Sequence, residues 1–578
     1  MNSKNKPALQ TLALVVIFFL ALFIWTIWQF HFNYMVSMYD TFFHSARIYE
    51  IRTAFLHHTL PSWVNFNTFF HTGQAINGMY PDFTLWPLVW ITNFLTPIHQ
   101  LIAIKSLIFG LTFVVSFISL NKRFEMRNAV LAATIFTLSG SALKDLTNEM
   151  QTGSAIVMIF AFPLLFTLKE AVESKKIDPP LIIKTALLMT IVINSHLLSA
   201  VVIAMMTGIF LVIVTLVKKN FVAWINLIVA SFLTIILSAP IIYRLIRISK
   251  TGLLAPFGKG HVNSDPIWTL FLTTSWNAKS TISVTAIILI VVTLIGLKKD
   301  KLKQLLPWMY IELALLLFSS NIVPWSILGR LPILNTFQYA SWRFALFLGM
   351  VPIILVLINF NSQNTRKIFT LMVILSYGMA IFYSFFDQYH KVSNSPIITA
   401  NSTKIVPNND YAKLTSTGIN SPTLMRTLIP DYAPNSVPMQ KDSDGASFDP
   451  QVVYLISHDL AVTKQRDIPL QQTANVNTTT LSANNVSKGT ITLPVFGYRS
   501  LNYQVKVNGK ASAFKINPAG FITIDNPTSF KHVSYQITQI QPRLYRPLIW
   551  LSFSLYLLLG LILLIPKIKN FNANFELF

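Results

Sequence analysis

The stretch MYDTFFHSARIYEIR, residues 38 to 52, places an acid, an imidazole and a guanidinium directly after a long apolar run. Asp40, His44 and Arg47 are spaced i, i+4 and i+7, so a helix would hold all three on one face. Such a trio is suited to proton transfer and to anion binding, as at the start of an active site. The same spacing also fits a capping or interfacial segment at a membrane surface, and the residues alone leave both interpretations open.

Other residues with useful chemistry lie further along the chain. Arg343 is expected at the outer end of a helix, next to Trp342 and after Gln338 and Tyr339, where it would either bind a phosphate or anchor the helix at the interface. Two acids, Asp145 and Glu149, are spaced i, i+4 in a later external loop. They are either a second acid or metal-binding pair, or part of a solvated loop.

One further histidine, His196, and the absence of cysteine limit which chemistry the chain can carry out. His196, in INSHLLSA, is interpreted as a buried, hydrogen-bonded side chain at the external surface or in a tight turn. The chain contains no Cys, which excludes disulfides, thiolate nucleophiles and Cys-based metal sites. The sequence shows no firm set of metal ligands, so we assign no metal site and leave dependence on a divalent metal open.

The composition shows that membrane-spanning helices must position these candidate site residues. Of 578 residues, 53% are hydrophobic and 12% are charged, with a mean hydropathy of +0.54. Soluble domains carry about 25% charged residues, so the chain is a polytopic membrane protein. The net charge of +23 lies mostly in short loops, where basic residues set topology and meet anionic lipid. This pattern argues against a nucleic-acid partner.

About twelve apolar runs are long enough to predict membrane-spanning helices. They lie near 11–31, 100–120, 128–144, 152–168, 180–196, 198–217, 222–242, 280–297, 306–322, 342–360, 367–386 and 547–566. The basic short loops alternate correctly if both termini are cytoplasmic and the short aromatic stretch 80–97 does not cross. We therefore expect an interfacial or re-entrant helix there, within a first external loop at 32–99. The basic loop 243–250 falls outside and breaks the rule.

Residues 387–546 differ from the rest because they are polar, lack Glu and carry strand signals towards their end. The alternating segment VKVNGKASAF predicts a β-hairpin with its turn at Asn508 and Gly509. We therefore expect a transmembrane core at 1–386, an extracytoplasmic β-rich domain at 387–546, and a final helix with a cytoplasmic tail at 547–578.

The first external loop resembles that of GT-C glycosyltransferases, which are membrane enzymes that take sugars from polyprenyl-phosphate carriers. The resemblance rests on an acid after the first helix, a following helix with His or Arg, a Leu-Pro-x-Trp element, a glycine-containing loop and a Tyr-Pro segment. Here these are Asp40, His44 and Arg47, Leu60 to Trp63, Gly73 to Gly78, and Tyr80 to Asp82. Asp82 departs from the pattern, which has a second proline, and Met38-Tyr39 stand where many relatives have a glycine.

Three later segments resemble one branch, the YfhO-like and "6-pyruvoyl-tetrahydropterin synthase-related" bacterial membrane proteins. They are LGRLPILNTFQYASWRFALFL (328–348), PDYAP (430–434) and LPVFGYRSLNYQVKVNGK (493–510). The resemblance implies a fold of about twelve helices with a terminal β domain. It also implies Asp40 as general base, and His44, Arg47, Gln338, Tyr339 and Arg343 as groups that bind substrate or its phosphate.

The expected function is transfer of a sugar from an undecaprenyl-phosphate donor to a cell-envelope acceptor, such as a teichoic-acid-like polymer, at the outer membrane face. One alternative is a lipid or polysaccharide transporter, for which Lys184 and Glu312 are the main charges within helices. Another is a non-catalytic assembly factor that uses the external domain to bind a partner. A scaffold should tolerate the loss of Asp40, whereas the enzyme should not.

Overall fold

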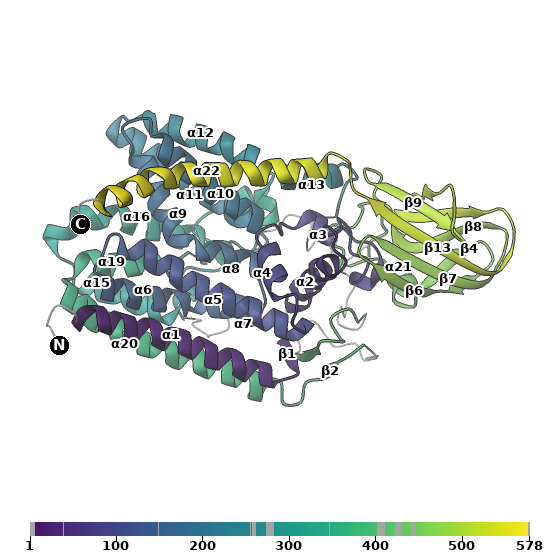
Figure 1. The fold of residues 1–578 in the computed structure, drawn as a ribbon, viewed down its shortest axis with the longest axis horizontal. Coiled ribbons are helices and arrows are strands. Elements are labelled where there is room, and N and C mark those ends of the chain that lie inside the picture. Colours follow the sequence, from purple (N-terminus) through teal and green to yellow (C-terminus); the bar gives the residue numbers. More distant parts are fainter. Residues whose placement is uncertain are drawn as a thin grey trace.

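The computed structural model describes residues 6–38, 40–147, 149–254, 256, 262–272, 282–345, 347–400, 411–421, 429–440 and 447–575. A body of long helices forms one end of the molecule and a β-sandwich forms the other (Figure 1). Short helices of the first loop lie between them, and α1 begins at the end of the body that is remote from the sandwich.

Five helices are long and apolar enough to cross a membrane. They are α1 (Lys6–His31), α5 (Pro97–Asn121), α11 (Leu197–Lys218), α20 (Ser362–Phe385) and α22 (Tyr545–Phe575). Large apolar side chains on their outer faces are exposed, including Phe23 and Leu558, as expected for contact with lipid. The chain is therefore a multi-pass membrane protein.

Three further spans are broken into bent pairs. They are α6 (Met126–Thr137) with α7 (Gly140–Thr147), α8 (Thr152–Ile159) with α9 (Ala161–Glu173), and α12 (Val222–Leu237) with α13 (Ala239–Ser249). The pairs bend by 46°, 60° and 69°, which brings the described total to between five and eight spans. Pro240 explains the last bend, because its ring clashes with the carbonyl of the preceding turn.

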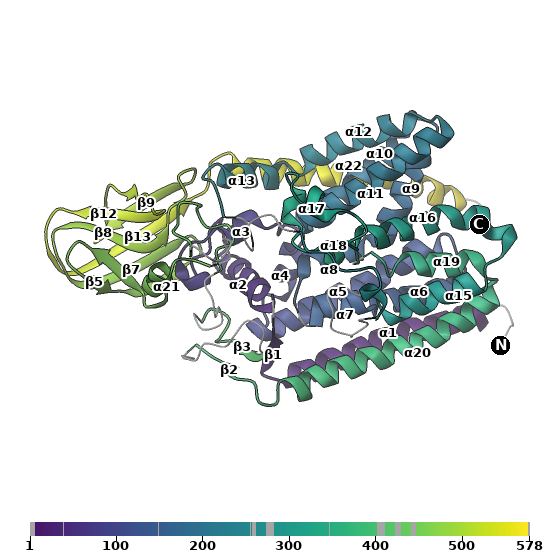
Figure 2. The same ribbon diagram turned by 180° about the vertical axis from the view of Figure 1, so that it is seen from behind.

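The remaining predicted spans correspond to shorter helices, so the count of about twelve stays a prediction. These helices are α10 (Pro179–Ser195), α15 (Val284–Ile295), α16 (Leu302–Phe318), α18 (Ala340–Ala345) and α19 (Val351–Asn359). Short helices α14 (Thr269–Leu272) and α17 (Trp325–Leu328) and the turns η3 (Lys299–Lys301) and η4 (Leu334–Thr336) connect them. A π-helical turn, η5 (Phe386–Lys391), continues from α20. In Figure 2, α17 and α18 lie over the middle of the helical body.

The first loop forms a compact layer between the helical body and the sandwich. Its elements are β1 (Tyr34–Ser37), α2 (Thr41–Leu56), η2 (Phe69–His71), α3 (Ile76–Met79) and α4 (Trp86–Thr92). With 7 residues, α4 is roughly 10 Å long and much too short to cross a bilayer. This length fits an interfacial helix within 80–97. Strand β1 pairs with β3 (Ala412–Thr415), which pairs with β2 (Ile397–Ile398).

Two five-stranded sheets build the sandwich, in the orders β10-β9-β13-β7-β6 and β11-β12-β8-β4-β5. The strands are β4 (Leu460–Thr463), β5 (Asp467–Pro469), β6 (Gln471–Asn475), β7 (Thr478–Val486), β8 (Gly489–Phe496), β9 (Asn502–Val507), β10 (Lys510–Ala511), β11 (Lys515–Ile516), β12 (Phe521–Asn526) and β13 (Phe530–Ile540). Helix α21 (Pro450–Ser457) packs on β4. Asn508 and Gly509 both have positive φ, at 49° and 80°, and β9 pairs with β10 around them, so the predicted hairpin is confirmed.

Hydrogen bonds join the sandwich to the first loop. The Tyr498 hydroxyl accepts from the Ala75 backbone N–H at 2.8 Å and donates to the Tyr432 carbonyl at 2.9 Å. The Phe496 backbone N–H donates to the Thr72 carbonyl at 2.8 Å. Phe69, Phe70 and His71, which directly precede Thr72, all have left-handed φ near 55°, so these bonds fasten the end of a strained turn.

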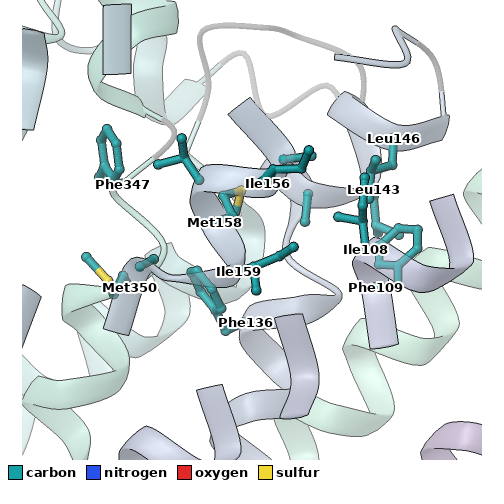
Figure 3. Close-up of a cluster of buried hydrophobic side chains, with 14 of the residues drawn as sticks. Ile108, Phe109, Phe136, Leu143, Leu146, Ile156, Met158, Ile159, Phe347 and Met350 are labelled. Carbon is teal, nitrogen blue, oxygen red and sulfur yellow. The ribbon is translucent and has the colours of Figure 1, made fainter. Parts of the chain in front are cut away.

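The helical core surrounds α8. Its side chains Ile156, Met158 and Ile159 are buried among apolar groups of neighbouring segments, including Phe136 and Phe347 (Figure 3). All eight residues of α8 are buried, so its C-terminal half is anchored in the core while its N-terminus reaches the polar groups described next.

Candidate functional site

Helix α2 brings together the three residues at the start of the first loop. Asp40 is its N-cap residue, and His44 and Arg47 follow on the same face, with Arg47 Nη1 3.3 Å from His44 Nδ1. Arg47 is only 1% exposed. Its Nη2 donates to the Pro81 carbonyl at 2.9 Å, and its guanidinium carbon lies 3.9 Å from the centre of the Tyr80 ring. The shared face that the spacing predicted is therefore present.

A glutamine that the sequence did not single out joins two of the predicted acids. Gln151 Nε2 donates to Asp40 Oδ2 at 2.9 Å and to Glu149 Oε2 at 2.8 Å. Lys144 Nζ lies 3.6 Å from Glu149 Oε1, and Ser154 Oγ donates to Asp145 Oδ2 at 2.6 Å. Asp145 and Glu149 are buried, which contradicts the expectation of a solvated loop. The acids belong to the same region as Asp40.

Arg343, on α18, also lies close to this region. Its Nε donates to the Phe337 carbonyl and its Nη2 to Gln338 Oε1, each at 2.9 Å. Its guanidinium also interacts electrostatically with Tyr80, Asp40, Tyr432 and Asp145. Gln338 thus orients Arg343 rather than contacting the acids. Its left-handed φ of 63° marks a strained backbone position.

Tyr339 is not brought into this group. Its ring stacks on Trp342 with 3.7 Å between centroids, and no described contact joins it to Asp40, Arg47 or Arg343. Its predicted role in binding substrate has no geometric support in the described residues.

We call the assembled residues the polar cluster: Asp40, His44, Arg47, Tyr80, Asp145, Glu149, Gln151, His196, Arg343 and Tyr432. His196 is buried and hydrogen-bonded, as expected, but its place in this cluster was not anticipated. Tyr432 comes from the PDYAP segment and has a left-handed φ of 60°. Burial raises the pKa of Tyr80 and of Tyr432, so both phenols stay protonated donors at neutral pH.

A buried ion pair holds the edge of the cluster. Arg244 Nη2 donates to Asp82 Oδ1 at 2.7 Å and to the Tyr80 carbonyl at 3.1 Å. Asp82 Oδ2 accepts from Trp86 Nε1 at 3.0 Å. Two exceptions in the sequence therefore explain each other, because Asp82 replaces the expected proline and Arg244 belongs to the basic loop 243–250 that broke the charge rule. A neutralised, buried arginine is a weak topological signal.

Glu50 fixes the loop after α2. Its carboxylate accepts from the Asn67 backbone and side-chain amides and from the Thr68 backbone amide and hydroxyl, at 2.8 to 2.9 Å. Burial raises the pKa of Glu50 to about 7, and the four donors oppose that rise. The role of Glu50 is to shape the loop beside the cluster.

A metal centre has no candidate among the described residues. No group of three or more His, Asp and Glu side chains among these residues is arranged to hold a metal ion. The polar cluster combines two guanidinium groups, Arg47 and Arg343, with three carboxylates, of which Asp40 is half-buried and Asp145 and Glu149 are buried. Chemically, such an arrangement can bind an anion and accept a proton next to it.

Comparisons with known proteins find seven similar chains among solved structures. No protein-family model matches the chain, and a search of curated proteins finds no match. The chain is similar to the single-particle cryo-EM structure of arabinofuranosyltransferase AftD from Mycobacteria, with 14% identity and a TM-score of 0.39 over 71% of this chain and 31% of that chain. It thus spans about a third of that protein.

The second similar structure is the crystal structure of ArnT from Cupriavidus metallidurans bound to undecaprenyl phosphate. The identity is 13% and the TM-score 0.41, over 76% of this chain and 88% of that chain. Both TM-scores are below 0.5, so the function proposed next depends on the chain's own residues.

Proposed function

We propose that the chain is a GT-C-type glycosyltransferase that moves a sugar from a polyprenyl-phosphate donor to a cell-envelope acceptor at the outer membrane face. One observation carries the proposal. Arg343 interacts electrostatically with Asp40, Arg47 lies on the same face of α2 as Asp40, and no carboxylate among the described residues lies within 4 Å of either guanidinium. This is an anion site adjacent to a candidate base.

Burial makes the unpaired charges informative. A charged group removed from water loses several kcal/mol of solvation unless a counter-charge is present. Arg47 has a carbonyl, an imidazole and an aromatic ring as neighbours, and its Nε has no hydrogen-bond partner. A bound phosphate would supply the missing negative charge, and a guanidinium binds a phosphate through two parallel hydrogen bonds.

The proposed reaction assigns each step to a residue. The acceptor hydroxyl oxygen attacks the anomeric carbon of the donor sugar, and its proton passes to the Asp40 carboxylate. The bond between that carbon and the phosphate oxygen breaks, so the polyprenyl phosphate leaves as a monoester with the bonding electron pair. Arg47, Arg343 and His44 stabilise the charge that develops on the phosphate. Gln151 holds Asp40 in place.

The finer features of the proposal rest on sequence resemblance. They are an undecaprenyl-phosphate sugar as donor, a teichoic-acid-like polymer as acceptor, and a relation to the YfhO-like branch. Cytoplasmic termini are proposed from the charge pattern of the loops, and the domain boundaries at 386, 387 and 546 from the change in composition and the strand signals.

A transporter is the second candidate, and one observation favours it. Glu312 lies in the interior of α16, is 4% exposed, and neither of its carboxyl oxygens has a hydrogen-bond partner among the described residues. An ionisable group buried within a membrane helix often marks a transport path. Lys184, the other candidate, has a side chain that is 42% exposed and lies 3.8 Å from Glu170, so it marks no such path.

The test of the transferase is Asp40→Asn in a strain that lacks the native copy. Wall and membrane glycans are analysed by mass spectrometry after protein levels are matched. We expect one sugar decoration to disappear in the deletion strain and to stay absent, or to fall by 10²- to 10⁴-fold, in the variant.

The matched control is Asp525→Asn, an exposed aspartate on β12 whose only described ion pair is with Lys515 at 3.7 Å. It should restore full decoration. Full decoration by Asp40→Asn would remove Asp40 from the mechanism. An unchanged glycan profile in the deletion strain itself would refute the transferase and favour the transporter.

A further inference from the structure

His196 occupies the corner between α10 and α11, where it caps the second helix. The Ser199 backbone N–H points at His196 Nδ1 at 3.3 Å, and the Ser199 hydroxyl lies 2.7 Å from the same nitrogen. A backbone N–H can only donate, so Nδ1 is the acceptor. The neutral ring therefore carries its proton on Nε2.

The other side of the ring lies within the polar cluster. His196 is 7% exposed, its ring centre lies 6.1 Å from that of Tyr80, and it interacts electrostatically with Arg343, His44 and Arg47. Nε2 has no hydrogen-bond partner among the described residues. Burial and the two guanidinium groups both disfavour a second proton on this ring, so His196 presents one uncharged N–H donor.

Gly153 permits this close packing at the start of α8. A Cβ atom there would lie 2.7 Å from the Ser195 carbonyl oxygen, 3.4 Å from Tyr80 Cε1 and 3.5 Å from His196 Cδ2. The corner that carries His196 is thus pressed against α8 and against Tyr80, which leaves the ring little freedom to turn away. Such restraint suits a donor that must be oriented before a ligand arrives.

We propose that His196 donates its Nε2 proton in a hydrogen bond to an oxygen of the donor phosphate, as the uncharged third contact of the anion site formed by Arg47 and Arg343. This inference rests on the proposed transferase function. The phosphate gains negative charge as the sugar leaves, so a fixed N–H donor strengthens its bond in the transition state more than in the ground state. Because the ring is neutral, it adds no further repulsion between the two arginines.

Two substitutions separate the capping role from the donor role. His196→Asn keeps an oxygen that can cap α11 in place of Nδ1, since Asn is a preferred N-cap residue, but it removes the donor at Nε2. His196→Gln places an amide N–H near the Nε2 position and gives up the cap. Full-length protein is purified in detergent, and steady-state transfer and binding of undecaprenyl phosphate are measured for both.

We expect His196→Asn to melt within a few degrees of the wild type and to lower kcat by 10- to 10³-fold with little change in KM. His196→Gln should recover at least tenfold of that loss despite a lower melting temperature. If His196 only capped α11, His196→Asn would instead keep a higher kcat than His196→Gln. Equal kcat for His196→Asn and the wild type would overturn the inference.

The same experiment distinguishes this failure from failure of the proposed function. If Asp40→Asn abolishes transfer while His196→Asn does not change it, only the role of His196 is wrong. If the wild type transfers no sugar, the proposed contact is tested by the affinity for undecaprenyl phosphate alone. Weaker binding to His196→Asn than to the wild type supports the contact between His196 and the phosphate. Equal binding, or none by the wild type, refutes it.

Discussion

Two arginines contact the Tyr80-Pro81 segment and are buried to the same extent, yet they have different surroundings. Arg47 and Arg244 are each 1% exposed, and each donates to a carbonyl of the Tyr80-Pro81 segment. Arg244 also has a carboxylate, Asp82, at 2.7 Å, whereas Arg47 has none within 4 Å among the described residues. The partner therefore distinguishes a structural arginine from one that is available to a ligand, and burial alone does not.

The largest effect on stability is expected from removing the Asp82 carboxylate, which pairs with Arg244. Asp82→Asn leaves the Arg244 charge buried without a partner, which should lower the free energy of unfolding by about 3–5 kcal/mol. Thermal unfolding in detergent measures the change. Adding Arg244→Gln to the same chain should recover part of the loss, because the unpaired charge is then removed too. A single variant that melts like the wild type would show that the pair is not essential.

At Arg47 we expect the opposite pattern, with a small change in stability and a large loss of sugar transfer. Arg47→Gln removes a charge that has no carboxylate partner, so the free energy of unfolding should change by only about 1 kcal/mol, the value of its hydrogen bonds. Sugar transfer should fall by about 10²- to 10³-fold through loss of a contact to the developing phosphate charge. Arg47→Lys, which keeps the charge without the planar fork, should retain an intermediate rate. Loss of folding with normal specific activity would reverse the two assignments.

Glu50 provides a smaller test because it is paired with neutral donors rather than with a cation. Glu50→Gln would turn one acceptor oxygen into an amide that faces the donors of Asn67 and Thr68. We expect a loss of about 1–3 kcal/mol, measured by thermal unfolding. Glu170→Gln is the control, since Glu170 forms an exposed pair with Arg123 and should change stability by less than about 1 kcal/mol.

The smallest effect is expected at Glu312, the buried acid without a partner. A bare charge there would be unfavourable by several kcal/mol, so the carboxyl group should be neutral. Glu312→Gln should therefore change stability by no more than about 1 kcal/mol and leave sugar transfer at the wild-type rate. A specific loss of sugar transfer at unchanged stability would instead give Glu312 a role in the transferase reaction.

Local patterns in the sequence predicted local structure well. The spacing of Asp40, His44 and Arg47 gave their common face, and Asn508-Gly509 gave the hairpin, because both depend on neighbouring backbone geometry. Hydropathy located the apolar runs but not the bends at 138–139, 160 and 238, since a bent helix and a straight one have the same average composition.

Contacts between residues far apart in the chain could not be predicted from the sequence. Asp82 and Arg244 are 162 positions apart, and each looked like an exception until the fold paired them. Gln151 and His196 were missed as members of the site because the residues that they meet there, Asp40 and Tyr80, lie far away in the sequence. His196 also caps α11 through Nδ1. Its electrostatic interaction with Arg343 and Arg47 depends on the fold and could not be predicted from the sequence.

The bonds from the sandwich to the first loop have a consequence for the order of synthesis. Ala75 and Tyr498 are 423 residues apart, so at 5–20 residues per second the ribosome needs roughly 20–85 s to add the second after the first. Throughout that interval the left-handed turn at 69–71 lacks the hydrogen bonds that the sandwich makes to Thr72 and Ala75. The loop beside the polar cluster is therefore completed last, and a nascent or truncated chain carries its arginines and aspartate without a finished site.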